Sequence, residues 1–135
     1  MIFGRSQVFA ACVLAVVGCS ASTSHTTRGG VYTADQAMRG KDVYAGMCVS
    51  CHAGMGNHTG PVFRARWGGQ NVQDLYRFIS ENMPKIDPGT LSSDEYVSVV
   101  AYLFQLNGMP AGATPLPTDT TVLKAITIDT TAPRR

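Results

Sequence analysis

The sequence has little net charge, few aromatic side chains and no apolar segment long enough to cross a membrane. Lysine and arginine number 11 against 9 aspartates and glutamates, a net charge of +2. This small excess argues against nucleic acid or an anionic membrane surface as the partner. Aromatic residues make up 8% and apolar residues 44% of the 135 residues, which suits one domain with a modest core. A bound cofactor could supply part of the missing buried surface.

The first eighteen residues are predicted to be a signal peptide. Arg5 is the only charged residue among the first twenty, and it precedes an apolar stretch at residues 8–18. A short charged region followed by an apolar region of this length is typical of export signals. The stretch is shorter than the roughly 20 apolar residues that a membrane-spanning helix needs.

Residues 16–20, Val-Val-Gly-Cys-Ser, resemble a bacterial lipobox, in which small residues precede the cysteine that becomes the N-terminus. The resemblance implies that Cys19 carries lipid and anchors the protein at the periplasmic side of a bacterial membrane, because several acyl chains together give stable anchoring. The alternative is a soluble periplasmic protein that is cleaved nearby. Residues 19–31 are rich in serine, threonine and glycine and are predicted to be a flexible tether.

Two cysteines remain for the folded part. Cys12 would leave with the signal and Cys19 would carry lipid, so only Cys48 and Cys51 are left and no disulfide framework is expected. Export also implies an oxidising compartment, in which a bare cysteine pair would tend to oxidise.

Cys48, Cys51 and His52 form a C-x-x-C-H motif, which three kinds of site could use. A structural zinc site takes four ligands, and no second pair of ligands is evident. A thioredoxin-like redox pair is expected near a βαβ pattern, whereas this chain shows helices and loops. In an exported protein the motif is instead read as covalent attachment of haem c. Each sulfur would bond one vinyl group of the porphyrin, and His52 would lie beneath the iron as the proximal ligand.

Three helices are predicted, each opened by a capping signal. They span residues 34–46, 72–82 and 93–106, after the capping residues Thr33, Asn71 and Ser92. The glycine-rich stretch 52–69 and the stretch 83–91 with its two prolines are predicted to be loops. Residues 113–135 are predicted to form an arm on the surface of the domain.

Residues 32–112 resemble the domain of class I c-type cytochromes. The matching features are a glycine and aromatic residues on the first and last helices, a Gly-Pro pair after the haem motif and a methionine before a proline, at Gly40, Tyr44, Tyr102, Gly60-Pro61 and Met83-Pro84. The resemblance implies an all-α fold of about three to four helices wrapped around one covalently bound haem c. The glycine would let two helix backbones cross closely, because it has no Cβ.

The resemblance also implies a set of residues around the haem. The carbonyl of Pro61 would accept a hydrogen bond from His52 and fix its tautomer. Met83 would be the sixth ligand, because Pro84 favours an extended backbone that lets the side chain reach inward. The rivals for this role are Met55, Met109 and His58.

Further residues are expected near the haem propionates. The resemblance implies that Trp67 donates its N–H to a propionate, although plain core packing is an alternative. Arg64 and Arg66 would either offset the propionate charge or form an exposed pair.

Histidine and methionine together would fill both axial positions, which leaves the iron no role except to change oxidation state. We therefore expect an electron carrier and not an enzyme, with a potential raised by the soft thioether ligand. Residues 81–112 and 116–128 are similar to cytochrome subunits linked to periplasmic quinoprotein dehydrogenases, which implies a dehydrogenase as donor and a terminal oxidase as acceptor. The alternative is a haem gas sensor or a haem enzyme with a displaceable sixth ligand.

Overall fold

The computed structural model describes residue 1 and the ranges 25–54 and 56–131. The predicted signal peptide (apart from its first residue), the lipidation site Cys19 and the candidate ligand Met55 lie outside the described residues. These assignments therefore stay predictions.

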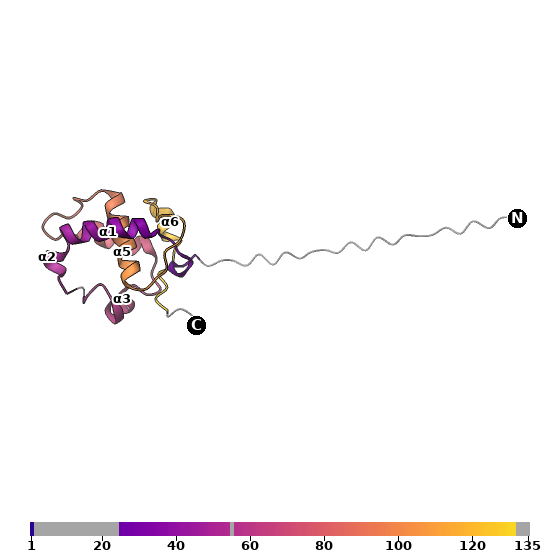
Figure 1. Cartoon of the computed structure of the whole chain (residues 1–135), viewed down its shortest axis with the longest axis horizontal. Helices are drawn as coiled ribbons and strands as arrows, with labels where there is room; N and C mark the ends of the chain where they lie inside the picture. The colour runs from indigo at the N-terminus through magenta and orange to yellow at the C-terminus, as the bar shows by residue number, and fades with distance from the viewer. Residues whose placement is uncertain (2–24, 55, 132–135) are drawn as a thin grey trace.

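The described residues form an all-α fold. The helices are α1 (Ala34–Met47), α2 (Val49–His52), α3 (Gly60–Trp67), α4 (Val72–Asn82), α5 (Ser93–Leu106) and α6 (Thr120–Lys124), after a short 3-10 helix at Thr27–Gly29. Figure 1 shows α1 and α5 together at the centre, α2 at the end of α1, and α6 toward the opposite side. Within the described ranges, no helix is both long and apolar enough to cross a bilayer.

Helices α1 and α5 cross at a point where only glycine fits. A Cβ built on Gly40 would lie 1.8 Å from the carbonyl oxygen of Ser98, far inside any normal contact. One turn further along, the rings of Tyr44 and Tyr102 meet with their centroids 5.6 Å apart. The predicted close crossing at Gly40 is therefore confirmed.

The predicted helix starts are confirmed, with one difference in detail. Ser92 and Glu95 form a complete capping box at α5, and Asn71 accepts a hydrogen bond from the next turn of α4. Thr33 likewise accepts a hydrogen bond from the N–H of Gln36 at the start of α1, but the side chain of Gln36 does not bond back to Thr33 to form a capping box. It is buried and makes two hydrogen bonds of 2.8 Å with the backbone N–H and C=O of Leu116.

The prediction that residues 52–69 form only a loop is wrong, because α3 lies within this stretch. Pro61 sits in its first turn, where the N–H that proline lacks would have had no partner inside the helix. Phe63 and Trp67 are four residues apart and both buried, so one face of α3 packs on the core. The flanking glycines and the shortness of the helix conceal this periodicity in the sequence. The stretch 83–91 contains no helix, as predicted.

The prediction that residues 19–31 form a flexible tether is wrong for its last part. Thr27 is 0% exposed, and its Oγ1 accepts a hydrogen bond of 2.9 Å from the N–H of Asp129. A side-chain nitrogen of Arg28 donates to the carbonyl of Gly108 at 2.9 Å. Residues 25–31 are thus part of the folded unit.

The prediction of a C-terminal surface arm is also wrong within the described residues. Four apolar side chains of this segment are buried in the hydrophobic core: Leu116, Leu123, Ile126 and Ile128. The backbone of Thr127 bonds to the N-terminal segment, and the N–H of Ile128 donates to the carbonyl of Gln70 at 2.8 Å. The apolar alternation here is too short to indicate a strand, and only tertiary contacts give it a partner.

Candidate cofactor site

A cavity of about 400 Å³ lies between the predicted haem motif, Cys48 to His52, and helix α4. Its walls come from the end of α1, from α2, α3, α4 and α5, and from the loop after α4. Most of the lining is apolar, with Phe63, Leu75 and Phe78 among the larger side chains. The volume falls within the range of about 300–1,000 Å³ that is usual for cofactor sites.

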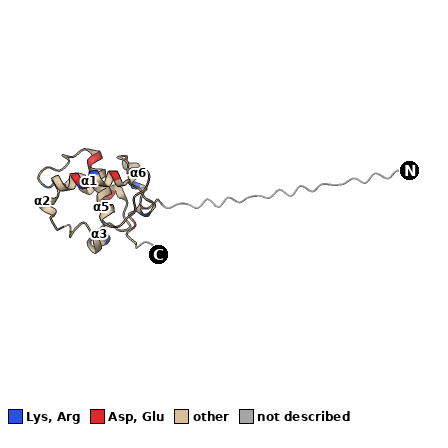
Figure 2. Ribbon diagram, in the orientation of Figure 1, with Lys and Arg blue, Asp and Glu red and all other residues tan. Residues whose placement is uncertain are grey.

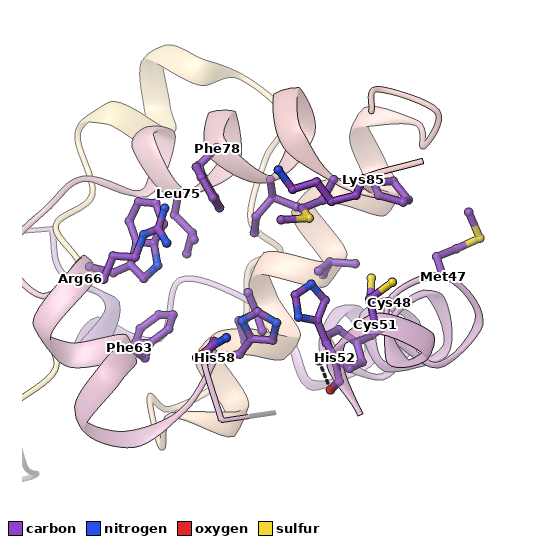
Figure 3. Close-up of a pocket in the computed structure, with 18 of the residues that line it drawn as sticks. Met47, Cys48, Cys51, His52, His58, Phe63, Arg66, Leu75, Phe78 and Lys85 are labelled. Carbon is purple, nitrogen blue, oxygen red and sulfur yellow. Dashed lines mark hydrogen bonds between the residues drawn. The ribbon is translucent and has the colours of Figure 1, made fainter. Parts of the chain in front are cut away.

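The two cysteines lie at one end of this cavity. Cys48 ends α1, where its N–H donates to the carbonyl of Tyr44 at 2.9 Å, and the next residues turn into α2. The carbonyl of Cys48 accepts hydrogen bonds from the N–H groups of Cys51 and His52 at 3.2 and 2.9 Å. These bonds place the two cysteines one helical turn apart, as their spacing predicts. Figure 3 shows both sulfur atoms beside His52. Burial raises the pKa of the Cys48 thiol, and the neighbouring Cys51 adds to the effect.

His52 and His58 lie on the same wall of the cavity. Their ring centroids are 4.3 Å apart in an edge-to-face arrangement, and both rings approach the cavity from the same side in Figure 3. The hydroxyl of Tyr44 donates to the carbonyl of His52 at 3.3 Å. Burial, together with His52, lowers the pKa of His58. Ligation of iron from opposite faces by two histidines would require His58 on the other wall, so this position argues against it.

Met83 lines the cavity from the end of α4. It directly follows α4, its N–H donates to the carbonyl of Ile79 at 2.9 Å, and its backbone is extended. Its side chain lines the cavity together with that of Lys85. Figure 3 shows Lys85 and the α4 side chains facing the wall that carries His52.

Two other methionines are less well placed. Met109 is 2% exposed, its carbonyl accepts a hydrogen bond from Tyr32, and its side chain is not among those that line the cavity. Met47 borders the cavity, but it is exposed and lies at the outer edge beside Cys48 (Figure 3).

The family model described as "Cytochrome C oxidase, cbb3-type, subunit III" matches residues 35–103. The chain belongs to this family of c-type cytochromes. The match runs from α1 through most of α5 and so includes both walls of the cavity. No curated protein and no solved structure matches the chain significantly.

Family and fold together identify a monohaem c-type cytochrome with the all-α class I fold and one covalently bound haem c. The residues that line the cavity suit a haem c, because two thiols, an imidazole and a thioether border one largely apolar space. When bound, the haem supplies an iron that changes its oxidation state by one electron.

Trp67 and Arg66 close one end of the cytochrome's cavity. Trp67 is 8% exposed, and its ring packs against Phe78 with the centroids 5.5 Å apart. The guanidinium of Arg66 lies over the same two rings, 5.0 Å from the centroid of Trp67 and 4.2 Å from that of Phe78. Trp67 is therefore both a core residue and a lining residue. A bond from its N–H to a propionate stays a prediction.

Arg64 and Pro61 differ from Arg66 in position. All three are exposed, but only Arg66 is among the residues that line the cavity. Of the two arginines, only Arg66 borders the cavity, and a role in offsetting the propionate charge stays a prediction. The predicted hydrogen bond between Pro61 and His52 stays a prediction.

Three polar residues in and around the cytochrome's site are marked by no local pattern in the sequence. Lys85 lines the cavity as a second cation. Asn107 joins the end of α5 to the segment before α3, since its side chain accepts from the N–H of Gly60 at 3.1 Å and donates to the carbonyl of His58 at 2.8 Å. Tyr96 makes a comparable link to the loop after α4. The partners are distant along the chain, so no local pattern marks these links.

Proposed function

We propose that this cytochrome carries single electrons, with Cys48 and Cys51 attached to the haem and His52 and Met83 as the axial ligands. The carrying observation is that the thiols, the imidazole and the thioether border one cavity, with His52 at the end of α2 and Met83 directly after α4. A six-coordinate iron of this kind has no open position for a substrate, which favours electron transfer over catalysis.

The side chains around the cavity would tune this role. With haem bound, Leu75, Phe78 and Val99 would limit the access of water to the iron, and the thioether of Met83 would favour its reduced state. Both effects would raise the potential. Arg66 and Lys85 would offset the charge of the two propionates. A carboxylate held by a cation in a partly apolar site stays ionised more readily than one without such a partner.

The partners and the location are part of the same proposal. A periplasmic quinoprotein dehydrogenase would donate electrons, and a terminal oxidase would accept them. The family description, which names an oxidase subunit, supports the acceptor. Acidic and basic residues are few and interspersed in the view of Figure 2, so docking would depend little on long-range steering. Lipid on Cys19 would hold the protein at the periplasmic side of a bacterial membrane.

The ligand assignment is tested with Met83→Ala in the full-length holoprotein, made with the haem-attachment machinery. The wild type is expected to show sharp reduced bands, a weak red charge-transfer band when oxidised, and no binding of carbon monoxide. Met83→Ala should lose the charge-transfer band and bind carbon monoxide, because its sixth position is open. Met47→Ala is the matched control, since Met47 borders the same cavity from its outer edge and should behave like the wild type.

Two outcomes would contradict the proposal. Equal binding of carbon monoxide by the wild type and Met83→Ala would mean that Met83 is not the ligand, and would favour the gas sensor or haem enzyme. A denatured polypeptide with the mass of the chain and its lipid alone would mean that no haem is attached to Cys48 and Cys51.

A further inference from the structure

The hydroxyl of Tyr96 lies between two backbone groups of the loop that follows α4. It donates to the carbonyl of Met83 at 2.8 Å and accepts from the N–H of Gly89 at 3.0 Å. One side chain thus fastens both ends of the segment 83–89 to the first turn of α5.

Met83 is consequently fixed on both sides of its Cα. Its N–H donates to the carbonyl of Ile79 in α4, and its carbonyl accepts from Tyr96 in α5. Pro84 is half-buried, residues 85–90 are exposed, and Ile86 is almost entirely in solvent. The backbone of Met83 is therefore the point at which an otherwise exposed loop is tied to two helices.

Tyr96 is itself held firmly. Its side chain is 2% exposed, and its ring meets that of Tyr76 of α4 edge-to-face with the centroids 6.3 Å apart. Its helix begins with the capping box at Ser92 and crosses α1 at Gly40. The hydroxyl is therefore presented from a rigid part of the core, where a hydrogen bond can fix the position of its partner.

We propose that Tyr96 is a positioning residue, which keeps the thioether of Met83 in reach of the iron by holding the Met83 carbonyl. The inference rests on the proposed function, in which Met83 is the sixth ligand. Without the hydroxyl, the carbonyl of Met83 and the N–H of Gly89 lose a shared partner. The loop then spends more time in conformations that carry the sulfur away, and an added ligand competes more easily for the iron.

The experiment compares Tyr96→Phe with Tyr76→Phe in the full-length holoprotein. Each variant loses one tyrosine hydroxyl from the same ring pair, but only Tyr96 bonds to the loop. Imidazole is titrated into the oxidised protein, and the charge-transfer band reports the bond between iron and sulfur. Tyr96→Phe should bind imidazole about tenfold more tightly than the wild type, the size expected from losing the hydrogen bond that holds the Met83 carbonyl. Tyr76→Phe should match the wild type.

Amide hydrogen exchange gives a readout that does not depend on the iron. The N–H of Gly89 should exchange faster in Tyr96→Phe, because its acceptor is gone, and should be unchanged in Tyr76→Phe. Thermal melting followed by circular dichroism reports general loss of stability. Titrations are made well below the melting temperatures, so that unfolding does not contribute to imidazole binding.

The outcomes separate the two proposals. If the wild type shows the charge-transfer band and Tyr96→Phe binds imidazole like the wild type, the role of Tyr96 is overturned and the ligation by Met83 stands. If the wild type lacks the band and Met83→Ala leaves its spectrum unchanged, both proposals fail.

Discussion

The two sides of α5 differ in how completely protein atoms fill them. On the side of α1, backbone meets backbone at Gly40, and Gln36 of α1 holds the backbone of buried Leu116 by two hydrogen bonds. On the other side, α5 contributes Val99 and Leu103 to a cavity of about 400 Å³. The contrast teaches that one half of the core is complete in the polypeptide, whereas the other half is shaped for the haem.

The same helix also reaches to both walls of the cavity. Near its start Tyr96 holds the loop with Met83, and after its end Asn107 holds the segment with His58 and Gly60. Single polar side chains thus hold the walls of the cavity. The scaffold, by which we mean the packed region around the crossing of α1 and α5, is instead held by close packing. We expect the cavity side to respond to small polar changes and the scaffold to respond to changes in volume.

The largest effect is expected when Cys48 and Cys51 are both replaced by serine, which should prevent covalent attachment. Without the haem, the apolar side chains that line the cavity would stay in contact with water, at roughly 2 kcal/mol for each large side chain left unburied. A few such side chains amount to much of the free energy of unfolding of an ordinary domain. The variant should lose most of its helical circular dichroism, and its denatured mass should lack haem. A haem-free variant that melts at the same temperature as the wild type would contradict this prediction, because it would show that the cavity side is stable without haem.

A smaller effect is expected from Gly40→Ala on the scaffold side. The added Cβ would lie 1.8 Å from the carbonyl oxygen of Ser98, so α1 and α5 must move apart, at a cost of about 3 kcal/mol. Gly46→Ala is the matched control in the same helix, because an added Cβ there meets nothing within 4 Å. The control should gain up to about 1 kcal/mol from helix propensity. Chemical unfolding measures both, and equal stabilities would contradict the close crossing.

The smallest effect is expected at the surface, where Glu95 completes the capping box of α5. Hydrogen bonds from the backbone N–H and the hydroxyl of Ser92 lower the pKa of Glu95 below its ordinary value. Its contribution to stability is therefore present above the unfolded pKa and is lost as the pH falls through the lower folded pKa. The melting temperature of Glu95→Gln should lie slightly below that of the wild type at neutral pH, and the gap should close in acid.

Glu81→Gln is the control, because it removes a like charge from an exposed position near the end of α4. Its difference from the wild type should not follow the titration of Glu95. A gap for Glu95→Gln that stays constant from neutral pH into acid would contradict a role for the ionised carboxylate.

The sequence predicted the parts of the fold that have local chemical causes. Ser92, Asn71 and Thr33 mark helix starts because each can bond to the following turn, and all three cap as predicted. Helix α3 was missed because its apolar face rests on only two side chains between glycines. The burial of the C-terminal segment was missed because Ile126 and Ile128 bond to residues far away in the chain, which no local pattern reveals.

The sequence by itself determined the haem motif, the methionine before a proline and the glycine at the helix crossing. These features depend on the identity of single residues and on their spacing along the chain, so they can be read without coordinates. Only the tertiary structure decided that His58 lies beside His52, that Arg66 and not Arg64 borders the cavity, and that Tyr96 and Asn107 fasten its two walls. Such contacts join residues that are distant in sequence, and they exist only once folding has brought those residues together.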